Sequence, residues 1–161
     1  MIIEVKHRPI LHPTKYMITN ASTHELLYFA NGFYFNCHRK LAFKDKSGQL
    51  IATGYKYNGN KYGVFNANEN ELFYFEKIRN YEQKFLIESD VCSLIINIDD
   101  KLKWSIYKDV ELIATVEKGF FFFKTIYRIN VKDDNDIALA ALIMTVVDHL
   151  YRKYDYNNYS I

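Results

Sequence analysis

Residues Ile137 to Val147 read Ile-Ala-Leu-Ala-Ala-Leu-Ile-Met-Thr-Val-Val, and this stretch decides the fold. It contains no charged residue, and Thr145 is its single polar side chain, so a helix formed here has no polar face. A helix that is apolar all round must be buried. These residues rise about 16 Å as a helix, which is too short for a hydrocarbon core of about 30 Å. The sequence therefore predicts an interior helix rather than a membrane span.

Three aspartates, Asp133, Asp134 and Asp136, stand just before the apolar run. Asp136 is the predicted N-cap, and the other acids suit the positive end of the helix dipole. The alternative is a Ca²⁺ site, because hard cations prefer carboxylate oxygens. An EF-hand loop needs a longer spacing and a closing Glu, which this segment lacks, so capping is favoured.

Basic residues follow the apolar run. His149, Arg152 and Lys153 suit the negative end of the dipole. We therefore expect the helix to extend over about 136–153. The segment 154–161 is polar and aromatic, and we expect a loosely ordered tail there.

The composition fits one globular domain over residues 1–161. The hydrophobic fraction is 49% and the charged fraction is 25%, which argues against disorder. A net charge of +2 lacks the basic excess usual for nucleic-acid binding. The first residues show no secretory pattern, so we expect a cytoplasmic protein in which Cys37 and Cys92 are reduced.

One unit recurs through the first four-fifths of the chain. Each copy opens with Lys and a large apolar residue, alternates for about five residues, passes a polar turn and returns. Leu50 to Thr53 recurs letter for letter as Leu112 to Thr115. The copies, of which those at 84 and 124 are weaker, begin at Lys15, Lys40, Lys61, Lys84, Lys103 and Lys124. Their spacing of about 20 residues fits one hairpin per copy.

Tandem hairpins predict an antiparallel meander of about twelve strands. A sheet of that width curls, and closure removes its exposed edges. Turn sequences at Asp45 to Gly48 and at Tyr57 to Asn60 agree with this pattern. The predicted fold class is therefore mainly β: a closed antiparallel β-barrel around a central, hydrophobic C-terminal helix.

The order of these features resembles the LURP-one-related proteins, which belong to the tubby C-terminal-like superfamily with the phospholipid scramblases. The resemblance rests on Tyr127 to Val131, the acidic break, and the apolar helix closing on Val147 and Asp148. Asp45 to Ala52 and Phe120 to Phe123 add to it. It covers about residues 2 to 153 and implies a twelve-stranded barrel around a central hydrophobic helix.

The resemblance also implies a function. Tubby domains bind phosphoinositide headgroups and scramblases act at membranes. We therefore expect a non-enzymatic binding module that recognises anionic phospholipid or phosphoinositide-like headgroups at the inner membrane surface, where the protein would be peripheral. The chain lacks the cysteine clusters and longer terminal apolar segment of scramblases, and no basic pair matches the tubby headgroup site.

Basic residues beside aromatic ones are the candidates for headgroup binding. They are Arg39, Lys40, Lys44, Lys46, Lys77 and Arg79. The alternative is that lysines at strand starts and edges prevent unwanted sheet pairing, and the recurring lysine of each repeat favours that interpretation.

The candidate partner patch is Phe120, Phe121, Phe122 and Phe123. Four consecutive residues of a strand place two side chains on each face. The outward pair is either covered by the segment 1–13 or exposed for a partner, a second copy or a membrane. The second function hypothesis is accordingly a protein-interaction or self-associating scaffold without lipid binding.

No motif predicts catalysis or a metal site. His38 follows Cys37 directly, and adjacent strand residues point to opposite faces, so they cannot act as a dyad. The other histidines lack paired-ligand spacing and are predicted to be surface or packing residues: His7, His12, His24 and His149. We therefore expect no enzymatic activity, no bound metal and no cofactor.

Overall fold

The computed structural model describes residues 1–8, 15–35, 38–57, 61–76, 84–88, 93–98, 102–121 and 124–157. Within these residues the chain forms β-strands, one 3-10 turn and one α-helix. The strands are β1 (Ile2–Arg8), β2 (Lys15–Asn20), β3 (Leu26–Phe35), β4 (His38–Asp45), β5 (Leu50–Tyr57), β6 (Lys61–Asn66), β7 (Glu71–Glu76), β8 (Lys84–Glu88), β9 (Ser93–Ile98), β10 (Lys103–Lys108), β11 (Glu111–Phe121) and β12 (Lys124–Val131). The 3-10 turn η1 (Asp134–Asp136) leads into α1 (Ile137–Asn157).

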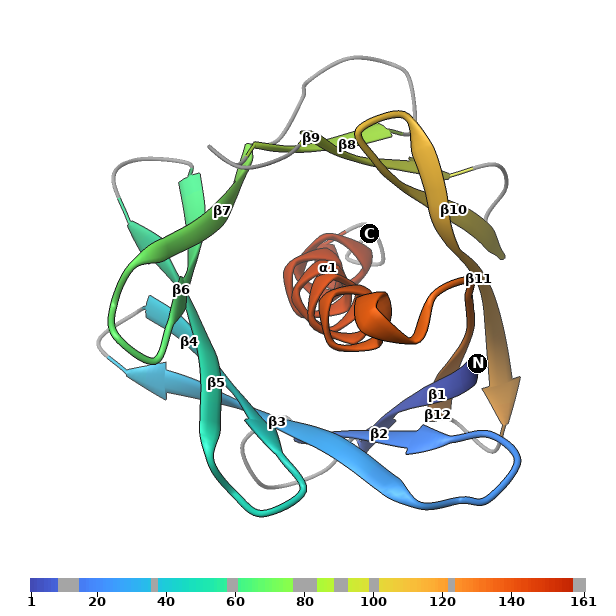
Figure 1. Ribbon diagram of the computed structural model, residues 1–161. Helices are drawn as coiled ribbons and strands as arrows, with labels where there is room; N and C mark the ends of the chain where they lie inside the picture. The colour runs from blue at the N-terminus through green and yellow to red at the C-terminus, as the bar shows by residue number, and fades with distance from the viewer. Residues whose placement is uncertain are drawn as a thin grey trace.

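Each strand pairs antiparallel with its neighbours in the chain, and β1 pairs with both β2 and β12. The order of hydrogen-bonded strands thus returns to its start and forms a closed barrel, and α1 lies inside it (Figure 1). The prediction of a mainly β chain of tandem antiparallel hairpins with one C-terminal helix is confirmed.

The seam between the first and last strands carries an ion-paired carboxylate. Glu4 of β1 lies directly opposite Arg128 of β12. Its oxygens lie 3.1 Å from the Arg128 guanidinium and 2.7 Å from Lys6 Nζ. The hydrogen bond from Lys6, which has the largest effect, and the one from Arg128 lower the pKa of the Glu4 carboxyl. Partial burial raises this pKa but does not outweigh them.

The repeat matches the strand starts. β2, β6, β8, β10 and β12 begin at the repeated lysine, and β4 begins two residues before Lys40. The large apolar residue after the lysine faces inward wherever its side chain is described. These residues are Tyr16, Leu41, Tyr62 and Trp104, and all are buried. Where both side chains are described, at Lys15, Lys40 and Lys103, the repeat sets an outward lysine beside an inward core residue.

The polar turn of the repeat also has a structural role. Asn20, Asp45 and Asn66 stand five residues after Lys15, Lys40 and Lys61. Each accepts hydrogen bonds from backbone N–H groups two to four residues later, which closes the hairpin. Each turn also contains one residue with a positive φ angle: His24, Gly48 or Glu69. Residues 58–60 of the other predicted turn lie outside the described residues.

The apolar helix fills the barrel. Ala140, Ala141, Ile143, Met144 and Val147 are at most 1% exposed. Thr145, the one polar residue of the run, donates to the Ala141 carbonyl at 2.7 Å. Its hydroxyl is thus satisfied inside its own helix.

The helix continues further than predicted. It ends at Asn157 rather than near 153, and its last turn holds no basic residue. The prediction that His149, Arg152 and Lys153 complement the dipole at the helix end is therefore wrong. No Gly or Pro follows Gly119 in the sequence, so no strong stop signal is present. Residues 158–161 of the predicted tail lie outside the described residues.

A charge at Leu142 tests whether the helix is the core. Leu142 is 5% exposed. Leu142→Asp places an unpaired carboxylate inside the barrel, and we expect it to cost more than about 4 kcal/mol and to prevent folding. Circular dichroism and thermal unfolding measure this. Leu142→Met is the control at the same position, with an expected cost below about 1.5 kcal/mol. A folded Asp variant of unchanged stability would contradict the central position of the helix.

Candidate functional site

Two of the predicted basic residues lie together on the outer wall of the barrel. Lys40 and Lys44 alternate with buried Leu41 and Phe43 along β4, so they face outward. Lys40 is directly opposite Tyr55 of β5, and its Nζ lies 5.6 Å from the centroid of that ring. This arrangement brings a cation into contact with an aromatic face.

A second ring extends this surface. Tyr55 stacks on Phe65 of β6 with centroids 4.7 Å apart and an interplanar angle of 14°. Both rings are half-buried. Lys40, Tyr55 and Phe65 are in contact on the outer face of three adjacent strands, and Lys44 lies four residues along β4 on the same face. We call these four residues the lysine–aromatic wall.

The remaining basic candidates do not join this wall. Lys46 lies in the turn after β4, where its Nζ is 2.6 Å from Glu25 Oε1. That hydrogen bond and the charge of Glu25 raise the pKa of Lys46. The side chain of Arg39 and the whole of Lys77 and Arg79 lie outside the described residues.

Phe120 of the predicted partner patch is 68% exposed. Along β11 it shares its face with buried Ala114 and Val116, which would direct it inward. The pairing of the β11–β12 hairpin with its neighbours, however, stops before Phe120. β10 pairs no further along β11 than Glu117, and β1 no further along β12 than Ile126. Phe120 therefore lies beyond the last residues of β11 and β12 that pair with β10 and β1.

The described part of the proposed cover, residues 1–8, leaves Phe120 exposed. Residues Ile2–Arg8 form β1, which is a strand of the barrel between β12 and β2. The side chain of Phe121, the residues Phe122 and Phe123, and the segment 9–14 lie outside the described residues.

The aspartates before the helix make capping and ionic contacts. Asp133, and not the predicted Asp136, accepts from a backbone amide, that of Asn135 at 2.9 Å. Asp134 lies 3.5 Å from the terminal ammonium of Met1. Asp136 lies 3.7 Å from Lys108 Nζ. Among the residues that the structure describes, no group of three or more His, Cys, Asp or Glu could hold a metal ion.

Sequence reasoning missed a polar cluster inside the barrel. Asp148 is 2% exposed and accepts hydrogen bonds from Tyr16 of β2, at 3.0 Å, and from Tyr127 of β12. His7 packs on Tyr16, with ring centroids 5.2 Å apart. The two phenol donors offset the cost of burying the carboxylate. They also hold the helix to strands on either side of β1.

One sequence feature indicated that Asp148 is buried. Asp148 directly follows the apolar run without any helix stop, so it must share the interior with that run. His149 is also buried and lies near Tyr62, with centroids 6.4 Å apart. His7 and His149 are thus packing residues, as predicted, and no sequence signal paired Asp148 with the two tyrosines.

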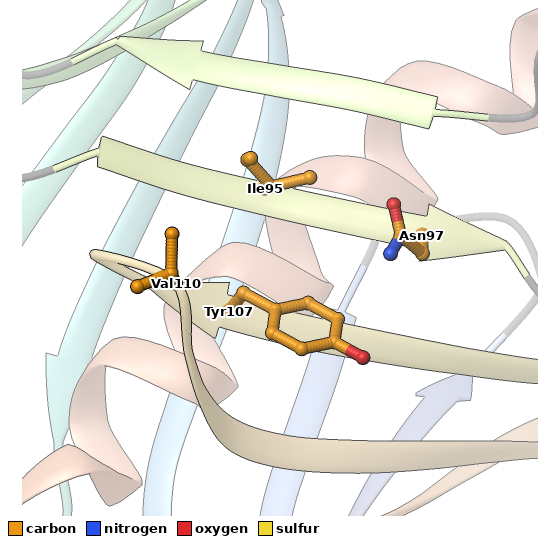
Figure 2. A pocket seen from close by; sticks show the side chains of 4 residues that line it. All are labelled: Ile95, Asn97, Tyr107 and Val110. Carbon is orange, nitrogen blue, oxygen red and sulfur yellow. The ribbon is translucent and has the colours of Figure 1, made fainter.

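An open hollow of about 300 Å³ lies on the outer wall over β9 and β10 (Figure 2). Ile95 and Tyr107 face each other there, with Asn97 and Val110 beside them. Val110 is 90% exposed at φ 69, after Asp109 at φ 49. These angles suit a two-residue hairpin turn but cost a β-branched side chain about 1–2 kcal/mol. None of the predicted site residues whose side chains are described lines this hollow.

The described residues hold no helix that is both long and apolar enough to cross a membrane.

Comparison with known proteins identifies the family. The profile of the LURP-one-related family matches residues 1–148. The chain belongs to the LURP-one-related family. Its structure is similar to the X-ray structure of a protein from Arabidopsis thaliana, with a TM-score of 0.57 and 14% sequence identity over 92% of this chain and 91% of that one. At this identity the likeness concerns the fold alone. No match was found among curated proteins.

Removing one donor from Asp148 tests the interior cluster of this LURP-one-related barrel. Tyr127→Phe leaves a buried carboxylate oxygen without that hydroxyl, and we expect a loss of about 1–3 kcal/mol in unfolding free energy. Urea unfolding monitored by circular dichroism measures it. Tyr107→Phe on the outer wall is the control and should cost much less. An unchanged midpoint for Tyr127→Phe would show that the hydrogen bond does not anchor the helix.

Proposed function

We propose that this protein is a non-enzymatic binding module that recognises anionic phospholipid headgroups at the inner membrane surface. The observation that carries the proposal is the contact of Lys40 with the Tyr55–Phe65 stack on the outer wall. Lysine attracts the phosphate groups of anionic lipids, while tyrosine places an apolar ring and a polar hydroxyl at the level of the headgroups.

The barrel interior supports an outside location for the ligand. α1 fills the space that a hollow barrel uses to enclose a ligand, and its inward residues are buried against the strands. Binding at the wall or the ends of the barrel needs no rearrangement of this core.

Co-sedimentation with vesicles tests the proposal. We expect more binding to vesicles of phosphatidylcholine with phosphatidylserine than to phosphatidylcholine alone, and less binding as salt is raised. Lys40→Glu should weaken binding about fivefold or more, because each lysine near the surface contributes about 1 kcal/mol. Lys132→Glu is the control. It makes the same change in net charge in the turn before η1, and it should weaken binding less than Lys40→Glu does.

Equal binding to neutral and anionic vesicles at low salt would reject headgroup recognition. Loss of binding by Lys132→Glu to the same extent as by Lys40→Glu would show that net charge alone is responsible.

The second candidate function is a self-associating scaffold, and the exposed Phe120 is the observation that favours it. Such a scaffold should elute as a dimer or larger species, and the Phe120→Ser variant should elute as a smaller one.

We expect instead that the wild type and Phe120→Ser are both monomers. Size-exclusion chromatography with light scattering measures the molar mass of each. A concentration-dependent dimer that Phe120→Ser abolishes would favour the scaffold.

A further inference from the structure

The lysines that open the repeats gather at one end of the barrel. In an antiparallel meander, alternate strands run in the same direction, so β2, β4, β6, β8, β10 and β12 all begin at the same end. Their repeat lysines therefore form a ring around that end, which we call the lysine rim: Lys15, Lys40, Lys61, Lys84, Lys103 and Lys124. The sequence repeat is thus also a repeat of charge in space.

Three of these side chains are described, and all three are exposed: Lys15, Lys40 and Lys103. The residue after each is buried in the core, so the lysines face outward. The other three lysines are placed by their backbone positions at the strand starts. Arg8, the last residue of β1, lies at the same end, opposite Lys15.

The opposite end of the barrel is acidic. The turns there carry Glu25, Glu69, Asp109, Asp133, Asp134 and Asp136. Three cations of that end are paired with these acids: Lys46 with Glu25, Lys108 with Asp136, and the Met1 ammonium with Asp134. The lysine rim has acids as well, at Glu76 and Glu117. Among the residues that the structure describes, the small net charge of +2 therefore hides one basic and one acidic end of the barrel.

Exposed apolar side chains accompany the lysines. Leu102 is 48% exposed and Phe120 is 68% exposed, and both lie at the lysine rim. The Lys118 amide donates to the Leu102 carbonyl at 2.7 Å, and Lys118 Nζ lies 5.3 Å from the Phe120 ring centroid. Cations around projecting apolar side chains are the pattern of a protein that rests on a lipid surface. An aliphatic Leu offers no stacking face to a nucleic-acid base, so lipid is favoured over nucleic acid.

We propose that the barrel docks end-on to an anionic phospholipid surface, with Lys15, Lys40 and Lys103 of the lysine rim on the headgroups and Phe120 and Leu102 entering the acyl boundary. This inference rests on the proposed function and specifies its contact face. Lys40 belongs to both the lysine–aromatic wall and the rim, and Lys44 belongs to the wall alone. The acidic end then faces away from the membrane. Repulsion between its carboxylates and the anionic headgroups disfavours docking by that end.

Paired charge reversals separate the rim from the wall. Lys15→Glu with Lys103→Glu alters the rim, and Lys44→Glu with Lys132→Glu makes the same change in net charge elsewhere. Binding to phosphatidylcholine vesicles with phosphatidylserine is measured for both, after circular dichroism confirms folding. We expect the rim pair to lose at least about 30-fold in affinity, since each lysine at an anionic surface contributes about 1 kcal/mol. The control pair should lose less than about a third of that factor.

A fluorescent side chain at either end tests the orientation. Phe120→Trp and Val110→Trp place a reporter at the lysine rim and at the opposite end. The wild type, which has only the buried Trp104, gives the background fluorescence. Above that background, vesicles with brominated acyl chains should quench the fluorescence of Phe120→Trp and leave the fluorescence of Val110→Trp unchanged. Equal quenching of both, or quenching of Val110→Trp alone, overturns end-on docking.

The outcomes distinguish the two proposals. If the wild-type protein does not prefer anionic vesicles, headgroup recognition and end-on docking both fail. If the wild type binds but the control pair loses more than the rim pair, the wall binds lipid and only end-on docking is rejected. If the rim pair loses binding to a single-stranded polynucleotide while its vesicle binding is unchanged, the rim is a nucleic-acid surface and docking is also rejected.

Discussion

The apolar surface of α1 is the constraint on which the rest of the structure depends. A helix without a polar face is stable only where other apolar side chains surround it on every side. One sheet face covers one side of a helix, whereas a barrel covers all of them. The inward residues of the strands do this, and Asp148 then fixes the helix through hydrogen bonds from Tyr16 and Tyr127. Enclosure and anchoring are thus separate contributions, one apolar and one polar.

Filling the barrel leaves its outside for function. In the three repeats whose side chains are described at both positions, one residue lies in the core and a lysine at the surface, so the same unit builds both the fold and the charge pattern. Because alternate strands start at the same end, the lysines gather there and the two ends of the barrel differ in charge. The basic end also holds Phe120, near the end of β11, while the short Asx-closed turns and the helix start occupy the acidic end.

Much of the fold was predictable, because periodicity reports backbone structure directly. The hairpin repeat, the polar turn at Asp45 and the buried helix follow from local patterns of apolar and turn residues. The helix end was not predictable, since no stop residue follows the apolar run. Asp136 was assigned as the cap, whereas Asp133 makes the capping contact, because the chain enters through a 3-10 turn that sequence alone does not reveal. Phe120 lies beyond the last pairs with β1 and β10, and no local pattern encodes where that pairing ends.

By itself the sequence determined that an all-apolar helix must be enclosed by tandem hairpins, because burial and alternation are local consequences of side-chain type. Only the tertiary structure decided what the enclosed and exposed residues do together. It brought Asp148 to Tyr16 across most of the chain, stacked Tyr55 on Phe65, and gathered lysines about 20 residues apart onto one rim. These contacts depend on strand register and closure, which set distances between residues that the linear order keeps apart.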